Sequence, residues 1–444
     1  MDPLGRQLFV SDGFTGALWA FNINPQTHVP VVVPTSPFVA QSNVEGVGTD
    51  PKGNFVYAPS YSSFDTQMFM VNHSTGGLKL LSNIRGPGGP KAVLLSTGTA
   101  AVKYVPKFAY VANSGSNSIS EYSFNSNGTL QELTGSPLSD SNGPISLVTT
   151  PSGAFVYAVE ANHKISGYSV GGSGTLTAVP GSPFSGFTAP VAVAADPTNT
   201  YLIVLDQGTA PNGGTLWMEK IGANGSLTLV NNAHNSSNTP AAMAMALGSD
   251  YIFVVNSTEK TFVVFQAGYT LNSPSIGGPN GTASTGNGPS AVTMDPSSNF
   301  VYVTNSTDGT VSAYKISDGS DGHPSGTPVP VAKSPFAAGT SPSAVVAEPS
   351  GKYLYVANSG SGNIFAYKIK ATTGALTRIA GTFATGSAPD SLTVSNDGKF
   401  LYATNKSSGN VSVFTINANG TLTTGTDSPT GTSPTSIAST GTTQ

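Results

Sequence analysis

The sequence predicts an all-β protein, a β-propeller of nine four-stranded blades in a single domain over residues 1–444. Three observations predict it: a short apolar run recurs nine times, turn residues divide each repeat into strand-length segments, and no segment carries a convincing helical period. The runs recur every 46 to 53 residues and begin at Leu8, Phe55, Phe108, Phe155, Tyr201, Tyr251, Phe300, Tyr353 and Phe400. An eight-bladed ring with one displaced repeat is the alternative, and the repeats at Phe55 and Tyr251 are the weakest.

Each repeat predicts four strands in a fixed order, as in residues 289–317. Pro289 opens a small apolar strand, the turn at Asp295-Pro296 leads to the run at Phe300, and Gly309 precedes a third strand. The run at Phe300 is apolar at successive positions, so both faces of its sheet should be covered. A fourth strand follows a hairpin, for which pairs such as Asn127-Gly128 predict a type I′ turn.

The two ends of the chain carry complementary fragments of a blade. The first repeat, at Leu8, lacks its opening strand, whereas residues 433–440 read as an opening strand with nothing after it. We therefore expect residues 433–440 to supply the first strand of the N-terminal blade. Such a composite blade closes the ring and leaves no open sheet edge.

The composition excludes several classes of partner. Charged residues make up 9% of the chain and the net charge is −4, so clustered basic residues for nucleic acid are missing. No apolar stretch is long enough for a membrane span, and there is no cysteine. Few charges oppose close packing, which favours self-association or a cell-surface or polysaccharide partner. We expect an extracellular or cell-surface location, with a leader upstream of Met1 already removed.

The blade phrases also resemble a known family. FVYVTNSTDGTVSAYKI at Phe300 and YLYVANSGSGNIFAYKI at Tyr353 resemble the YVTN-type repeats of bacterial and archaeal surface proteins. They are also similar to the lactonase-like propellers, which include the 6-phosphogluconolactonases. The resemblance implies the propeller fold and, for the enzymes, hydrolysis of sugar lactones. Their His-Pro-His and Asp-Leu-Gly-x-Asp phrases are replaced here by phrases such as GPS at Gly288 and NSTDG at Asn305.

Candidate site residues are few. The five histidines are dispersed and no G-x-S-x-G phrase marks a nucleophile, so we predict no catalytic residue, no metal site and no cofactor. In a propeller the residue after each opening Pro should lie near the mouth of the central channel. It is charged at Lys91, at Asp390 and at Glu45, where Val44 takes the place of Pro. These three residues predict a polar ligand site, and the alternative is an ordinary surface ion pair.

The resulting hypothesis is a secreted or cell-surface propeller that acts in binding or extracellular assembly without catalysis. It rests on the neutral polar surface, the missing family phrases and the lack of a cluster of titratable groups. The alternative is a sugar-lactone hydrolase of the 6-phosphogluconolactonase-like family. A third hypothesis is a ligand-binding or redox-accessory propeller that uses its channel mouth.

Overall fold

The computed structural model confirms that the chain is all-β. Every regular element in the part of the chain that it describes is a strand, and no helix there could cross a membrane. The structure describes residues 6–12, 15–24, 27, 29–41, 44, 46–49, 54–60, 63, 65–72, 75–85, 104–140, 142–196, 199–208, 213–235, 239–245, 251–268, 274–296, 299–318 and 324–443.

The strands form nine antiparallel sheets, which belong to two compact units. One unit comprises mainly Met1–Ala101 and contains two sheets, ordered β1-β2-β3, with β4 also paired to β2, and β5-β6-β7-β8. Its strands are β1 (Gln7–Asp12), β2 (Ala17–Ile23), β3 (Pro30–Val32), β4 (Phe38–Val39), β5 (Gly48–Thr49), β6 (Phe55–Ser60), β7 (Asp65–Val71) and β8 (Leu78–Arg85).

The other unit contains the remaining seven sheets. The first has the order β11-β10-β9-β40, with β12 paired to β10; it contains β9 (Tyr104–Asn113), β10 (Ser118–Phe124), β11 (Leu130–Glu132), β12 (Leu138–Ser139) and β40 (Pro434–Thr443). The next three sheets each follow chain order. They are β13 (Pro144–Thr149), β14 (Phe155–Glu160), β15 (Ile165–Val170), β16 (Leu176–Ala178); β17 (Pro190–Ala195), β18 (Tyr201–Asp206), β19 (Gly214–Ile221), β20 (Leu227–Asn235); β21 (Pro240–Met245), β22 (Tyr251–Asn256), β23 (Thr261–Gly268) and β24 (Ser275–Ser284).

The last three sheets also follow chain order, and each has a short fifth strand paired to its third strand. They are β25 (Pro289–Met294), β26 (Phe300–Asn305), β27 (Thr310–Asp318), β28 (Pro324–Pro330), β29 (Phe336–Ala337); β30 (Pro342–Ala347), β31 (Tyr353–Asn358), β32 (Asn363–Ile369), β33 (Leu376–Arg378), β34 (Phe383–Ala384); β35 (Pro389–Val394), β36 (Phe400–Asn405), β37 (Asn410–Ile416), β38 (Leu422–Thr424) and β39 (Ser428–Pro429).

The first strands of the seven sheets contact one another in a cycle. The order is β40, β13, β17, β21, β25, β30, β35 and again β40, so these strands are the innermost ones of a ring. The prediction of nine blades in one ring is therefore wrong, because the cycle is complete after seven sheets. Local patterning reveals how many blade-like sheets exist, but it does not reveal which sheets contact each other.

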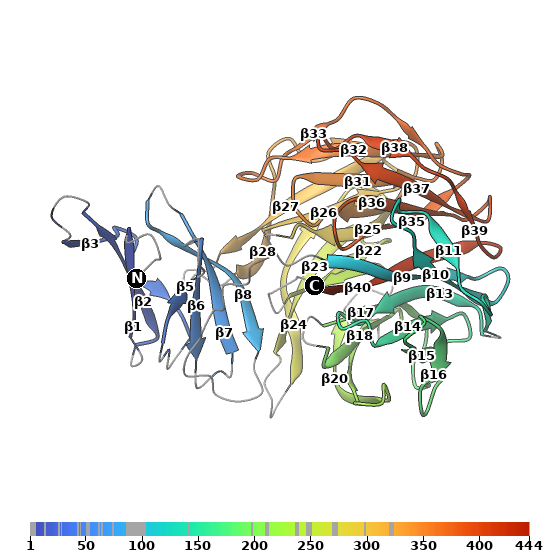
Figure 1. Ribbon diagram of the computed structural model, residues 1–444, viewed down its shortest axis with the longest axis horizontal. Helices are drawn as coiled ribbons and strands as arrows, with labels where there is room; N and C mark the ends of the chain where they lie inside the picture. Colours follow the sequence, from blue (N-terminus) through green and yellow to red (C-terminus); the bar gives the residue numbers. More distant parts are fainter. Residues whose placement is uncertain are drawn as a thin grey trace. The chain divides into compact units, whose positions relative to one another are not determined.

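The predicted closing strand also pairs in a different place. β40 pairs with β9, from Pro434 opposite Asn113 to Thr443 opposite Tyr104, and not with the strand at Leu8. Figure 1 shows β40 beside β9, although the two strands are more than 300 residues apart in the sequence. β9 pairs with β10 along one edge, and β40 pairs with its other, inner edge. The phrase at Gly89, from which the third repeat was expected to begin, lies outside the described residues.

Neighbouring sheets of the ring are joined by buried tyrosines. In five sheets the tyrosine in the middle of the second strand donates a hydrogen bond from its hydroxyl to a glycine carbonyl in a hairpin of the next sheet. The pairs are Tyr110 with Gly174, Tyr157 with Gly225, Tyr302 with Gly374, Tyr355 with Gly420 and Tyr402 with Gly128, at 2.7 to 3.1 Å. The last pair joins the sheet of β35–β38 to the sheet that contains β40.

The second strands lie in the middle of the core, as the sequence predicts. Every residue of β18, β22 and β26 is buried, which requires a packed neighbour on both faces. The hairpins differ from the predicted type I′ turns. At Asn127-Gly128 only the glycine has a positive φ, of 84°, and its N–H donates to the carbonyl of Asn125, as in a type I turn followed by a left-handed glycine.

Candidate functional site

A bulge near the start of each innermost strand marks one end of the ring. In all seven sheets the pairing register between the first and second strands shifts by one residue directly after the opening proline. A bulge changes the direction in which the extra side chain points. We call the seven extra residues the bulge ring; they are Thr435, Ile145, Val191, Ala241, Ser290, Ser343 and Asp390.

Side-chain hydrogen bonds connect three neighbouring members of the bulge ring. The hydroxyl of Ser290 donates to the carbonyl of Pro342 at 2.8 Å, and that of Ser343 donates to the carbonyl of Pro389 at 2.6 Å. Each of these bonds connects one innermost strand to the next. Asp390 therefore projects from a strand whose position is set by its neighbour.

A second set of residues lies beside the bulge ring. In each sheet the residue after the second strand donates its backbone N–H to the carbonyl of the residue before the opening proline. The seven donors are Ser114, Ala161, Gln207, Ser257, Ser306, Ser359 and Lys406. The repeat thus places a pair of side chains at the same location in every sheet.

Only the sheet of β35–β38 has charged residues at both of these positions. The Lys406 ammonium lies 3.7 Å from Oδ2 of Asp390, and the side chains are 49% and 32% exposed. The corresponding pairs in the other six sheets are uncharged. Six sheets fold without charges here, so the fold does not require the Asp390–Lys406 pair.

The environment of Asp390 increases the proton affinity of its carboxyl group. Burial raises the pKa of Asp390 above its ordinary value, and the charge and hydrogen bond of Lys406 act in the opposite direction. A carboxylate with a raised pKa is a stronger base than an ordinary aspartate. The ammonium beside it can hold an anionic or carbonyl oxygen. Together, the two groups can take a proton from water and stabilise negative charge on a substrate.

The structure places only part of the predicted ligand site. Asp390 lies in the bulge ring, whereas Glu45 and Lys91 lie outside the described residues. Lys406 does not follow an opening proline, so the pattern that marks Asp390 does not mark it. The signal for Lys406 lies in the second strands, because it is the one charged residue among the seven that follow those strands.

A second group of carboxylates is too deeply buried to contact a substrate. Glu160 is 0% exposed and Asp140 is 4% exposed, and the Tyr168 hydroxyl donates to Oδ2 of Asp140 at 2.6 Å. Burial, and then the neighbouring Asp140, raise the pKa of Glu160 to about 8. These groups therefore affect the pH dependence of stability and not the binding of a substrate.

Comparison with known proteins identifies the family that the ring resembles. Residues 233–439 match the family model "Lactonase, 7-bladed beta-propeller". None of the curated proteins matches the sequence. The match includes both Asp390 and Lys406, and it confirms the resemblance to lactonase-like propellers.

Two solved structures show the same fold over most of the chain. A protein from Bacteroides uniformis, provisionally named a 6-phosphogluconolactonase, is 20% identical with a TM-score of 0.61, covering 75% of this chain and 99% of its own. The periplasmic gluconolactonase of Pseudomonas aeruginosa is 16% identical with a TM-score of 0.59, covering 77% of this chain and 99% of its own.

These comparisons overturn the hypothesis of a non-catalytic binding or assembly protein. The matched family is one of lactonases, and both named structures carry lactonase names. That hypothesis relied on missing histidine phrases and on the lack of a titratable cluster. It overlooked Lys406, which stands beside Asp390 in the folded chain.

Proposed function

From its resemblance to the lactonase-like propellers, we propose that this chain hydrolyses the ring ester of a sugar lactone. The observation that carries the proposal is the Asp390–Lys406 pair, which is the charged exception among seven equivalent positions. Both residues lie within the stretch that matches the lactonase family model.

The chemistry requires a base and a group that stabilises negative charge. The Asp390 carboxylate accepts a proton from water as the water oxygen attacks the lactone carbonyl carbon. The Lys406 ammonium hydrogen-bonds the carbonyl oxygen, which becomes negatively charged in the tetrahedral intermediate. The ring C–O bond then breaks, and the departing oxygen receives the proton held by Asp390. One lactone and one water thus yield one hydroxy acid.

A purely structural role explains this pair less well. An ion pair that is partly open to solvent, as this one is, contributes only about 0–1 kcal/mol to the free energy of unfolding. The equivalent positions Ser343 and Ser359 in the preceding sheet carry no charge, yet that sheet has the same bulge and the same backbone hydrogen bond. The charges are therefore better explained by an interaction with a ligand.

The test is hydrolysis of glucono-lactone and 6-phosphogluconolactone by purified protein, followed through the acid released. We expect turnover above the buffer rate, and a loss of about 100-fold in kcat/KM in Asp390→Asn because the base is removed. Lys406→Met should also lower kcat/KM. It should in addition move the acidic limb of the pH profile to higher pH, since the lysine lowers the pKa of Asp390.

The same sheet supplies a matched control. Asp397 and Lys399 form an ion pair of 2.9 Å in the turn between β35 and β36, away from the bulge ring. Asp397→Asn should leave kcat/KM of the folded protein unchanged. If Asp390→Asn hydrolyses lactones as fast as the Asp397→Asn control, the assignment is wrong. If the unmodified protein does not exceed the buffer rate with any lactone, the proposed function itself is wrong.

A further inference from the structure

Glu219 occupies a position that the other six sheets of the ring fill with an aromatic side chain. It lies on β19 opposite Leu202 of the second strand. The residues in the same register elsewhere are Tyr122, Tyr168, Phe265, Tyr314, Tyr367 and Phe414, all of which are buried. Glu219 is itself only 7% exposed, so a carboxyl group replaces a ring inside the core.

The aromatic residues show what this position normally does. Tyr367 donates its hydroxyl to the carbonyl of Ala337, in the connection that leaves the preceding sheet. Tyr314 makes the same kind of bond to Ser284 of the sheet before it. By register, Ser185 is the residue that corresponds to Ala337, since Phe184 and Phe336 both pair with the third strand of their sheet. A tyrosine at position 219 would therefore fill the space beneath Ser185.

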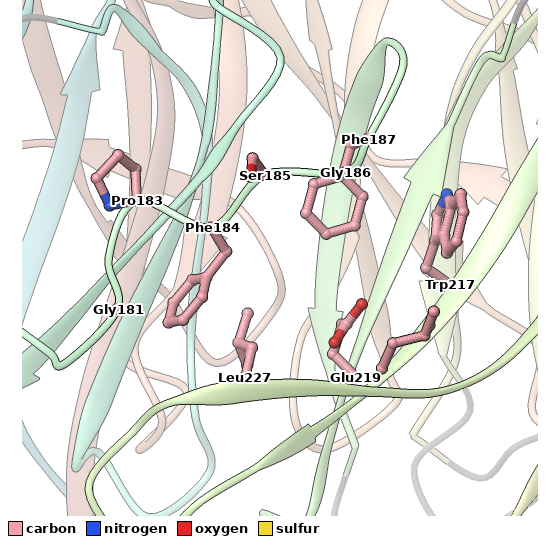
Figure 2. A pocket seen from close by; sticks show the side chains of 10 residues that line it. Gly181, Pro183, Phe184, Ser185, Gly186, Phe187, Trp217, Glu219 and Leu227 are labelled. Carbon is pink, nitrogen blue, oxygen red and sulfur yellow. The ribbon is translucent and has the colours of Figure 1, made fainter.

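That space is a cavity of ≈ 390 Å³. It lies between β19–β20 and the connection of residues 181–187, and its volume is in the range of small-molecule sites. Figure 2 shows Glu219 within it, with the rings of Phe184, Phe187 and Trp217 around the carboxyl group. The Phe187 and Trp217 rings meet edge to face, with their centroids 5.9 Å apart.

One polar group that faces this cavity has no partner. Among the described residues no hydrogen bond or ion pair reaches the Glu219 carboxylate, and desolvation alone raises its pKa to about 7. The indole N–H of Trp217 also has no acceptor, but its nitrogen is fully buried and out of reach of a molecule in the cavity. A carboxylate left unpaired in a largely apolar pocket is costly. A ligand that satisfies it needs a positive charge.

We propose that this cavity binds a small organic ammonium ion. The aromatic rings attract the cation and the Glu219 carboxylate pairs with it. The lining residues belong to the outer strands β19 and β20 and to the connection of residues 181–187, whereas the bulge ring belongs to the innermost strands. The two sites therefore use different residues, and the existence of this cavity does not depend on lactone hydrolysis.

Choline is a suitable probe, because it carries a permanent positive charge and has a neutral analogue of nearly the same shape. Titration calorimetry of the full chain at pH 8 should show saturable binding of choline. Its neutral analogue, in which carbon replaces the charged nitrogen, should bind about tenfold more weakly or worse.

Three variants assign the interactions. Glu219→Gln should weaken choline binding by about tenfold or more and leave the neutral analogue unaffected. Trp217→Leu should also weaken choline binding, because it removes an aromatic ring from the cavity wall. Glu219→Tyr should abolish binding and raise the melting temperature by filling the cavity. Glu132→Gln, at an exposed position on β11, is the control and should change nothing.

The proposal fails if choline does not bind saturably. It also fails if the neutral analogue binds as tightly as choline, since the cavity would then be simply apolar. Equal choline affinity in Glu219→Gln and the unmodified protein would likewise overturn it, provided that both proteins melt at similar temperatures. None of these outcomes affects the lactonase assay, so the two proposals can fail separately.

Discussion

Glu160 is the residue at which burial has its clearest electrostatic effect. It ends β14, where the other six sheets of the ring end their second strands with Asn or Asp. The longer side chain brings a carboxyl group into the core beside Asp140, where neither is solvated. Because the pKa of Glu160 is raised to about 8, the folded protein holds a proton that the unfolded chain releases at a lower pH.

This proton makes stability depend on pH. Between the ordinary glutamate pKa and the raised value, the folded state binds more protons than the unfolded state, so the free energy of unfolding falls as pH rises. We expect Glu160→Gln to remove this contribution. Urea unfolding at pH 5 and pH 8 should show the unmodified protein losing roughly 3–4 kcal/mol relative to the variant. Parallel pH profiles for the two proteins would show that Glu160 is not protonated in the fold.

At the scale of the residue, the sequence indicated Asp390 but not its partner. Asp390 stands directly after an opening proline, so a repeat alignment marks it as unusual. Lys406 lies 16 residues further along and reaches Asp390 only because β35 and β36 pair. The sequence does not mark Glu219 as unusual either. The residues around Trp217 and Glu219 alternate between apolar and polar, as they do in an ordinary strand. Only its register with six aromatic residues shows that it is exceptional.

At the scale of the element, sheets of the ring depend on the tyrosine-to-glycine bonds between them. The sheets of β17–β20 and β21–β24 carry Ile203 and Phe253 at the tyrosine position, so the position itself tolerates other side chains. What the tyrosines add is a buried hydrogen bond to the next hairpin. The same hairpins pack closely on the first aromatic residue of the strand, as Gly374 does on Phe300.

We therefore expect Tyr302→Phe to destabilise the ring through the unpaired carbonyl of Gly374. The hydroxyl and the carbonyl are 3.0 Å apart and buried, and the loss should be about 1–3 kcal/mol in chemical denaturation. Tyr353→Phe is the matched control, because its hydroxyl bond to Ala418 is exposed to solvent. Equal effects of the two substitutions would argue that the buried bond contributes no more than the exposed one.

The individual strands could largely be predicted from the sequence, and their grouping could not. Opening prolines, glycine turns and apolar runs marked the strands because these signals act over a few residues. Whether residues 433–440 pair with β1 or β9 depends on contacts between segments far apart. Both strands carry a similar apolar pattern, so the pattern could not separate Leu8 from Phe108 as the partner.

At the scale of the whole molecule, the seven-sheet ring depends on β40. Beyond its backbone pairing with β9, β40 also contacts β13 and β35, the innermost strands of the two neighbouring sheets. Ser436 accepts the N–H of Leu147 on β13, and the N–H of Ile437 reaches Ser391 on β35. The extracellular location and any self-association of the chain stay predictions at this scale.

Deleting Pro434–Thr443 should destabilise the ring far more than the loss of a terminal strand usually does. The deletion exposes the inner edge of β9 and the core around Ile437, so we expect a lower melting temperature and concentration-dependent aggregation. Deleting residues 1–101 is the comparison. The seven-sheet unit has its own core and closing strand, and it should keep a cooperative transition. A β40 deletion that melts like the full chain would show that the ring does not need this strand.

The pairing of β40 with β9 also has a consequence for the order of events on the ribosome. β9 leaves the exit tunnel among the first strands of the ring, while its inner partner is translated after all the others. The hydrogen bond from the Phe108 N–H to the Thr440 hydroxyl spans 332 residues, so forming this contact costs a large amount of chain entropy. Throughout the synthesis of six sheets, β9 therefore presents an unpaired edge of the kind that recruits foreign strands. Nascent chains should be most vulnerable to misassembly in that interval, and release of the last strand ends it.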